Sequence, residues 1–373
     1  MHQRMEIVRG CIAANTAGTA ARALIPASRA FLPIWHESGA HSRPKENLMR
    51  ARLGAALAAL ALGFAAQSQA QSQAPSNQYP NAPVKVVVPF AAGSSTDMVG
   101  REVARILGDA LHQSFIVENR PGAQATIGSA LVARAAPDGY TLLLGSNTSI
   151  AAAPFLIKDV PYKPLKDFVP VARVGSVPFV LVVRPDVPAK TAAELIDYTR
   201  QHPGKLTWGY ANSANQAAAA AMTKAAGLET TAVPYTSVPQ LVVDMLGGRL
   251  DFAIIDVTNA APQIKSGKLR ALAVTPAHEI SALPGVPPLG STLSGFELVG
   301  WYGLYAPAGT PQAVVDRLSA ALLQGLQDGA VRQHFAQAGL ETYPAGAAEL
   351  AGFGQAETAK WQRLAHDAGI VPQ

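Results

Sequence analysis

The sequence predicts an α/β protein of two domains, each with a mainly parallel β-sheet flanked by helices, and with a ligand cleft between the domains. Short runs of β-branched residues alternate with segments of helical periodicity over most of the chain, which is the pattern of βα units. Two groups of such units follow one another, and the chain then returns to the first group, so we expect two crossings between the domains. Domain 1 is expected over residues 83–176 plus 297–373, and domain 2 over 177–296.

The N-terminal part has the pattern of a secretory signal peptide. Basic residues at Arg50 and Arg52 precede a mostly apolar run over 53–66, and small residues at Ser68 and Ala70 fit a cleavage site. The run is too short to cross a bilayer, which takes about 20 residues. A buried Ala/Leu helix is the alternative for this segment. We expect 49–70 to be the signal peptide, 71–82 to be a polar spacer, and 1–48 to be a non-native upstream extension or a disordered leader.

Composition and charge exclude several classes of protein. With 49% hydrophobic and 15% charged residues in 373, the chain is not disordered, collagen-like or built on a disulfide framework. The net charge of +5 lies in residues 1–70, which leaves 22 basic and 22 acidic residues in the remainder. A nucleic-acid partner is therefore not expected. The single cysteine, Cys11, lies in the same N-terminal part, so the body has no thiol for catalysis, metal binding or disulfides.

In the first predicted domain, strands are short apolar runs and helices carry apolar residues three or four positions apart. The expected strands are Val84–Val88, Phe115–Glu118 and Tyr140–Leu144, and the expected helices are Met98–Leu111 and Ile127–Ala135. Asp97, or Thr96 before it, is expected to cap the first of these helices.

The second predicted domain repeats this order after a proline-rich region, 154–178. Its expected strands are Phe179–Val183, Leu206–Tyr210, Phe252–Asp256 and Leu269–Thr275, and its expected helices are Ala192–Gln201, 214–226 and Pro239–Leu246. Trp301–Ala306 is expected to return the chain to domain 1. Three helices then follow, near 311–326, 330–338 and 347–365, with Thr310 as the cap of the first.

No catalytic or metal-binding motif is present. The sequence has no Gly-x-Ser-x-Gly, no His-Glu-x-x-His, no phosphate loop and no clean dinucleotide fingerprint. The histidines beyond the N-terminal part are scattered singly, and no pair has the spacing of a metal site: His112, His202, His278, His334 and His366. We therefore expect neither a metal nor another cofactor, and no enzyme.

Small polar residues follow four of the predicted strands, at the strand ends where α/β sheets bind ligands. The first such loop, Pro89–Asp97, leads into a helix whose free N–H groups suit a carboxylate or a phosphate. An ordinary βα turn is the alternative for this loop. The other three are Gly145–Ser149, Asn212–Gln216 and Ile255–Asn259. Most of their side chains are neutral donors, which suit a receptor that must release its ligand.

Several motifs, in order along the chain, carry a resemblance to one family. They include Pro89-Phe90-x-x-Gly93-x-x-x-Asp97, Glu118-Asn119-Arg120-Pro121-Gly122-Ala123, Pro137-Asp138-Gly139-Tyr140-Thr141, Leu246-Gly247-Gly248 and Ala306-Pro307-Ala308-Gly309-Thr310-Pro311. Over nearly all of 79–373 the chain resembles the solute-binding receptors of tripartite tricarboxylate transporters, the Bug receptors. The resemblance implies a periplasmic-binding-protein-like fold of type II, a Venus flytrap that closes on a small acid and presents it to a membrane permease.

The resemblance also implies which residues bind the ligand. In the family, loops after the first and third strands hold a carboxylate through backbone groups and waters. The matching positions here are Phe90, Ala91, Ala92, Gly93, Ser94, Ser95, Ser146, Asn147 and Thr148. The second domain selects the rest of the ligand, at positions matching Asn212, Ser213, Asn215, Tyr235, Asp256, Val257 and Thr258.

The chain departs from the family pattern within these loops. Ser94 stands where a second glycine is usual, and Gln124-Ala125 stands where the family has Gly-Gly. In the second domain, Ala214-Asn215-Gln216 replaces a Gly-x-Gly followed by histidine, so we expect that loop to follow another path.

The resulting hypothesis is a periplasmic receptor for a small organic acid, or for an amide or amino-acid analogue, that delivers it to permease subunits of a tripartite tricarboxylate-type transporter. A ligand sensor that engages a membrane signalling protein is the second hypothesis, and an enzyme on the same fold is the third. The sequence does not identify the ligand.

Overall fold

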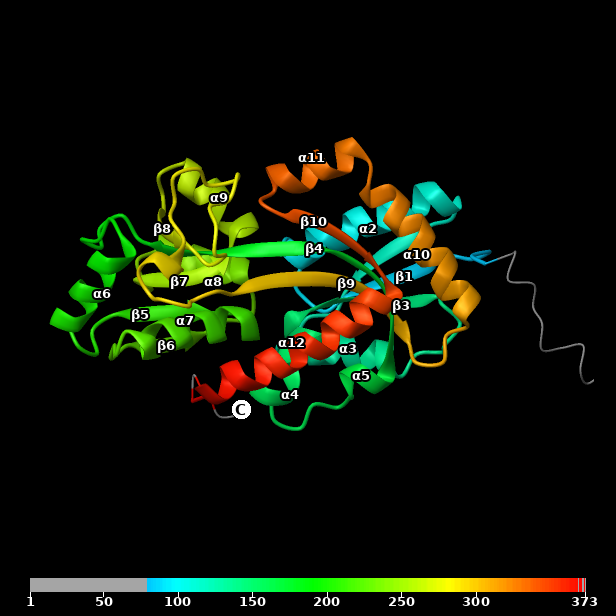
Figure 1. Ribbon diagram of the computed structural model, residues 1–373, viewed down its shortest axis with the longest axis horizontal. Coiled ribbons are helices and arrows are strands. Elements are labelled where there is room, and N and C mark those ends of the chain that lie inside the picture. Colours follow the sequence, from blue (N-terminus) through cyan, green and yellow to red (C-terminus); the bar gives the residue numbers. More distant parts are fainter. Residues whose placement is uncertain (1–78, 368, 371, 373) are drawn as a thin grey trace, which may run out of the picture. The chain divides into compact units, whose positions relative to one another are not determined.

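The computed structural model describes residues 79–367, 369–370 and 372 (Figure 1). The predicted extension, the signal peptide and most of the polar spacer lie outside these residues. None of the described helices has the length and apolar character needed to cross a membrane.

The described strands form a ten-stranded sheet with the order β2-β1-β3-β9-β4-β7-β5-β6, and both β8 and β10 also pair with β4 (Figure 1). Their bounds are β1 Val84–Val88, β2 Phe115–Asn119, β3 Thr141–Ser146, β4 Phe168–Val183, β5 Thr207–Tyr210, β6 Thr231–Pro234, β7 Phe252–Asp256, β8 Arg270–Val274, β9 Val299–Pro307 and β10 Glu341–Gly346. The predicted α/β class is confirmed.

The expectation of mainly parallel sheets is wrong. Pairs β1–β2, β1–β3, β5–β6 and β5–β7 are parallel, whereas every described pairing of β4 and of β9 is antiparallel. In the sheet order, β9 and β4 lie between the two groups of parallel strands. They are antiparallel to each other, β9 is antiparallel to β3, and β4 is antiparallel to β7. Residues 168–178 of β4 pair with β9, and residues 179–183 pair with β7 and β8.

Helices cover the sheet, and several begin directly at the end of a strand (Figure 1). Their bounds are α2 Ser95–Leu111, α3 Thr126–Ala133, α4 Ala153–Leu156, α5 Pro164–Asp167, α6 Ala192–Gln201, α7 Ser213–Ala225, α8 Val238–Leu246, α9 Val257–Lys265, α10 Gln312–Leu326, α11 Gly329–Gln337 and α12 Ala347–Asp367. A π-helix, η2 Asn147–Ala152, precedes α4, and a 3₁₀ turn, η3 Leu289–Ser291, precedes β9.

Two expected helix caps are one to three residues away from the observed ones. Helix α2 starts at Ser95 rather than near Met98, and its N-cap is Ser94, whose Oγ accepts from the Asp97 N–H at 3.2 Å. Asp97 is thus the third residue of the helix, and the expectation that it caps α2 is wrong. For α10 the N-cap is Pro311 rather than Thr310.

Three strands were not expected: the first part of β4, β6 and β10. Pro170 and Pro178 lie within β4, and a proline cannot donate to a β-ladder, so no strand was expected in this proline-rich region. In the structure β4 shifts register against β9 between Pro170 and Ala172, and again between Arg173 and Gly175. Such bulges accommodate residues that a regular strand excludes.

The core accounts for the apolar character of the strands. Val86, Val87 and Val88 are all fully buried, as expected for a strand with helices on both faces. One apolar cluster includes residues of strands that lie on both sides of β4 in the sheet order. The buried residues of a second cluster all lie within 180–283. The boundaries of the two domains remain a prediction.

Candidate functional site

Four helix N-termini meet at one buried cavity. Helix α2 follows β1, η2 follows β3, α7 follows β5 and α9 follows β7, each after a short loop or directly. One residue at or beside each of these N-termini lines the cavity: Thr96, Asn147, Asn212 and Asp256. The first turn of a helix has N–H groups without an intrahelical acceptor and carries partial positive charge, so the cavity suits an anion.

The cavity is small, and its lining is mostly neutral and polar. Its volume is about 20 Å³, which is space for roughly one water molecule. It is lined by Phe90, Ser95, Thr96, Ser146, Asn147, Thr148, Val177, Phe179, Asn212, Ala214, Asp256 and Tyr302. None of these residues is basic, so an anion held here is bound by dipoles and neutral donors rather than by an ion pair.

Asn147 is the clearest ligand donor of the cavity. It is 3% exposed, and its side-chain Nδ2 is buried without a hydrogen-bond partner among the described residues. Asn215 lies in the first turn of α7, and both polar atoms of its side chain are also buried without a hydrogen-bond partner among the described residues. The same is true of the Thr258 hydroxyl in α9. Leaving a buried polar group unpaired costs about 1–3 kcal/mol, so the unpaired Asn147 Nδ2 in the cavity lining indicates binding of a polar ligand.

Asp256 is the one carboxyl group of the cavity lining. It is buried and caps α9, with its Oδ1 accepting from the backbone N–H of Asn259 at 3.1 Å and from Asn259 Nδ2 at 2.6 Å. Burial raises the pKa of Asp256, while the hydrogen bonds from Asn259 oppose that shift. A carboxyl group placed in this way can accept from a ligand hydroxyl or amine.

Asp97, in contrast, has both carboxylate oxygens engaged within the protein. Its Oδ2 accepts from Gly93 N and from Arg101 Nε, both at 3.0 Å, and its Oδ1 accepts from Asn119 Nδ2 at 2.9 Å. Burial alone raises the pKa of Asp97, but these bonds outweigh it and leave the pKa below its ordinary value. Asp97 thus ties the loop after β1 to β2 and to α2.

The predicted ligand-binding residues divide into three groups. Seven of them line the cavity: Phe90, Ser95, Ser146, Asn147, Thr148, Asn212 and Asp256. Ala91 and Tyr235, together with Phe90, line an open groove of about 410 Å³ beside it. The remaining seven line neither hollow: Ala92, Gly93, Ser94, Ser213, Asn215, Val257 and Thr258.

Several residues of the third group have other contacts. Ser94 caps α2, the Ser213 hydroxyl donates to Gln124 Oε1 at 2.7 Å, and Val257 is fully buried in an apolar cluster. In the groove, the Tyr235 hydroxyl donates to Asp244 Oδ2 at 3.0 Å. Tyr235 therefore presents its ring, rather than a free hydroxyl, to the groove.

Five residues of the cavity lining are not among the predicted ligand-binding residues: Thr96, Val177, Phe179, Ala214 and Tyr302. Val177 lies in the first part of β4, where no strand was expected, whereas Phe179 begins the part of β4 that was expected. Ala214 lies in the first turn of α7, between residues with polar side chains. Tyr302 follows Trp301 in β9. Neighbouring residues of a strand point to opposite faces, and Trp301 instead donates to the buried Glu357 at 2.9 Å. Strand alternation could have indicated Tyr302.

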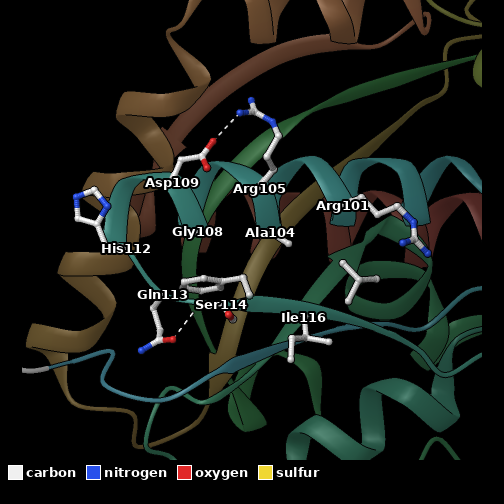
Figure 2. Close-up of a pocket in the computed structure, with 11 residues that line it drawn as sticks. Arg101, Ala104, Arg105, Gly108, Asp109, His112, Gln113, Ser114 and Ile116 are labelled. Atoms are coloured by element: carbon white, nitrogen blue, oxygen red, sulfur yellow. Dashed lines mark hydrogen bonds and ion pairs between the residues drawn. The ribbon is translucent and has the colours of Figure 1, made fainter.

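A further hollow of about 920 Å³ lies between α2 and β2, away from the four helix N-termini. Figure 2 shows the ion pair of this hollow, in which Arg105 donates to Asp109 at 2.8 Å along the helix. Arg101 at its rim pairs with Asp97. This hollow is open, and it brings together none of the predicted ligand-binding residues.

Comparison with known proteins shows the family and the fold type of the chain. Residues 99–370 match the model of the family described as tripartite tricarboxylate transporter family receptor, TctC. Among solved structures, the chain is similar to Rpa4515 of R. palustris with adipate, at 31% identity over 79% of this chain and 100% of that one, with a TM-score of 0.77. It is similar to MatC (Rpa3494) from Rhodopseudomonas palustris with bound malate, at 31% identity over 77% and 100%, with a TM-score of 0.73.

The periplasmic binding protein BugD is also similar, at 35% identity over 79% of this chain and 100% of that one, with a TM-score of 0.75. These similarities confirm the expected periplasmic-binding-protein type of α/β fold.

Proposed function

Because the chain belongs to the tripartite tricarboxylate transporter receptor family, we propose that it is a periplasmic receptor that captures a small organic acid and delivers it to a membrane permease of that transporter type. The relatives of known structure are binding receptors rather than enzymes. Rpa4515 is seen with adipate and MatC with malate, which supports a carboxylate as the ligand of this chain too. Residues 49–70 are proposed to direct the chain to the periplasm.

The observation that carries the proposal is the convergence of four helix N-termini on the cavity that contains Asn147. A carboxylate accepts hydrogen bonds only, and the first turns of α2 and η2 offer backbone N–H groups as donors. The buried Asn147 Nδ2 adds a side-chain donor that has no other partner among the described residues. We assign the ligand carboxylate to this end of the cavity, near Ser95, Thr96 and Asn147.

The opposite wall of the cavity is proposed to select the remainder of the ligand. It is formed by Asn212, Ala214 and Asp256, which come from α7 and from the end of β7. Because Asp256 is an acceptor, we propose that it favours acids with a hydroxyl or amine donor over plain diacids. A diacid would have to place its second carboxylate close to the Asp256 carboxyl group, where like charges repel.

The cavity is proposed to open and close as the two predicted domains move about β4 and β9. As it stands, it holds roughly one water molecule, so a four- to six-carbon acid enters only when its walls separate. A ligand that contacts both walls then shifts the population toward the closed form, and the permease recognises that form. Neutral donors suit this cycle, because release does not require a buried ion pair to break.

A thermal-shift panel on the purified protein tests the proposal. The panel comprises plain dicarboxylates, hydroxy acids, amino acids and aromatic acids, each beside its primary amide of the same length. We expect acids, but not their amides, to raise the melting temperature, by roughly 2–4 °C at about 100 times the dissociation constant. Within the acids, hydroxy acids and amino acids with a single carboxylate should bind more tightly than plain dicarboxylates of similar length. Equal shifts from acids and amides would contradict the proposal.

A further inference from the structure

The turn between β2 and α3 lies at the mouth of the cleft. Gly122, Ala123, Gln124 and Ala125 line one side of the open groove, and Ala211, Tyr235, Thr236 and Ser237 line the other. Phe90 lines both this groove and the buried cavity, so the two hollows are neighbours. The turn therefore faces, across the groove, the part of the chain that forms the opposite wall of the cavity.

The backbone of this turn is unusual for its sequence. Ala123, Gln124 and Ala125 are all left-handed, with φ of 43°, 48° and 75°, although none is a glycine. Such a conformation is unfavourable for residues with a Cβ atom and persists only when surrounding contacts hold it. Here the Thr126 hydroxyl donates to the carbonyl of Ala123 at 2.8 Å, and the turn leads directly into α3.

The side chain in the middle of the turn makes a contact across the groove. Gln124 Oε1 accepts a hydrogen bond from Ser213 Oγ at 2.7 Å. Ser213 is fully buried as the first residue of α7, between Asn212 and Ala214, which both line the cavity. The contact thus joins a turn on one side of β4 in the sheet order to a ligand-proximal helix on the other side.

The turn is itself anchored to the loop that carries Phe90. Asn119 Nδ2 donates to the Phe90 carbonyl at 3.1 Å, and Arg120 N donates to the Val88 carbonyl at 2.8 Å. A movement that separates Gln124 from Ser213 therefore carries the loop after β1 with it. Because Phe90 lines the cavity, such a movement displaces part of the cavity wall.

We propose that Gln124 is a positioning residue for closure: its hydrogen bond with Ser213 stabilises the closed form and thereby increases ligand affinity. This inference rests on the proposed function, in which the cleft opens and closes around an acid. It deepens that function by assigning the closing contact to a residue outside the cavity lining. Gln124 acts through Ser213 rather than by touching the ligand.

The distance between two spin labels tests the proposal without a ligand. Leu131 on α3 is 41% exposed and Val243 on α8 is 64% exposed, so both tolerate Leu131→Cys and Val243→Cys, in a background in which the single native cysteine is removed by Cys11→Ser. In this doubly labelled protein, Gln124→Ala should shift the ratio of long to short distances by about fivefold, which is the effect of one neutral hydrogen bond. Affinity for malate, or for the best acid of the panel, should fall by a similar factor.

Ser213→Ala should have the same effect, and the double variant should have no larger effect than either single one, because both changes remove one contact. Gln333→Ala, at an exposed position on α11, is the matched control and should change neither readout. Distances that Gln124→Ala leaves unchanged, both without ligand and with saturating acid, would overturn the proposal. The proposal would also be overturned if the effect of the double variant equalled the sum of the effects of the two single variants.

The two proposals fail separately. If no acid binds but Gln124→Ala still lengthens the distances, the receptor function is wrong and the closing contact stands. If acids bind and neither distance nor affinity responds to Gln124→Ala, the receptor function stands and the role of Gln124 is wrong.

Discussion

The hydroxyl groups of Ser95 and Tyr302 lie 2.8 Å apart in a hydrogen bond that joins the first turn of α2 to β9 across 207 positions of sequence. Both residues line the cavity. Burial, together with the nearby charge of Asp256, raises the pKa of Tyr302, so its hydroxyl keeps its proton at neutral pH. The floor of the cavity is therefore a pair of hydroxyl groups with a fixed position relative to the helix N-terminus.

Replacing Asn147 tests the assignment of the carboxylate. Asn147→Ala removes a buried donor that has no partner among the described residues, so we expect little loss of stability without ligand. A hydrogen bond to a charged group is worth about 1.5–3 kcal/mol, so affinity for the acid should fall by roughly 10- to 150-fold. Isothermal titration calorimetry measures the affinity, and thermal unfolding measures the stability.

Asn81→Ala is the matched control for this variant, because Asn81 is exposed and accepts from Tyr140 away from both hollows. Its affinity should equal that of the wild type. An Asn147→Ala variant that binds the acid normally would place the carboxylate elsewhere.

The buried carboxyl group of Asp256 predicts a pH dependence of stability. Its pKa is raised in the folded state, so the folded protein holds the proton more tightly than the unfolded chain. The stability that this raised pKa contributes is fully present below the pKa of Asp256 in the unfolded chain. It is lost as the pH rises through the pKa of Asp256 in the folded protein. Asp256→Asn keeps an acceptor for the N-cap and removes the ionisation, so the melting temperature of the variant minus that of the wild type should increase from pH 4 to pH 8. A difference that decreases with pH would show that ionised Asp256 is stabilised in the fold.

Asp97 predicts the opposite sign. Its pKa is lowered by hydrogen bonds from Arg101, from the Gly93 N–H and from Asn119, which together outweigh the effect of burial. The ionised form therefore stabilises the fold above the unfolded pKa, and this stability is lost as pH falls through the folded pKa. We expect Asp97→Asn to lower the free energy of unfolding by about 1–2 kcal/mol at pH 7. The deficit should shrink toward zero in denaturant titrations at increasingly acidic pH, and a deficit independent of pH would rule out this origin.

Helix α3 packs closely against neighbouring backbone at Gly128, where only a glycine fits. A Cβ atom at this position would lie 2.7 Å from the Arg120 carbonyl oxygen and 2.9 Å from Pro89 Cα, both backbone atoms. Gly128→Ala should therefore push α3 away from the loop that carries Phe90, lowering stability by roughly 1–3 kcal/mol and weakening ligand binding as well. Chemical denaturation and calorimetry measure the two effects.

Gly352→Ala provides the comparison for this substitution. Gly352 lies inside α12, and an added Cβ atom there meets nothing within 4 Å, so the variant should be more stable than the wild type by about 0.5–1 kcal/mol. Equal effects of the two substitutions would mean that close packing at Gly128 is not the cause.

The sequence predicts the parts of the site that depend on local order along the chain. Asn147 follows the apolar strand β3 directly, Asp256 is the last residue of the apolar strand β7, and in α/β proteins ligands bind at such strand ends. A short polar segment after a strand is visible without knowledge of strand order. The spacing of apolar residues in a helix is also a local pattern, so most of the predicted helices lie within a few residues of their observed bounds.

Residues that reach the site through pairing of distant segments could not be predicted in this way. Tyr302 in β9 and Phe179 in β4 line the cavity because these two antiparallel strands lie between the groups of parallel strands. The first part of β4 contains prolines, so its sequence does not show the pattern of a strand. Gln124 is visible in the sequence as a departure from Gly-Gly. Its partner Ser213 is set by the packing of segments 89 positions apart, which no local pattern contains.

A crystal structure with the most tightly bound acid of the panel would locate the ligand carboxylate. We expect this carboxylate within hydrogen-bond distance of the backbone N–H of Ser95 or Thr96 and of Asn147 Nδ2, with Asp256 facing the other end of the ligand. An acid bound instead in the hollow between α2 and β2, or lying with its carboxylate on the Tyr235 side of the groove, would contradict this expectation.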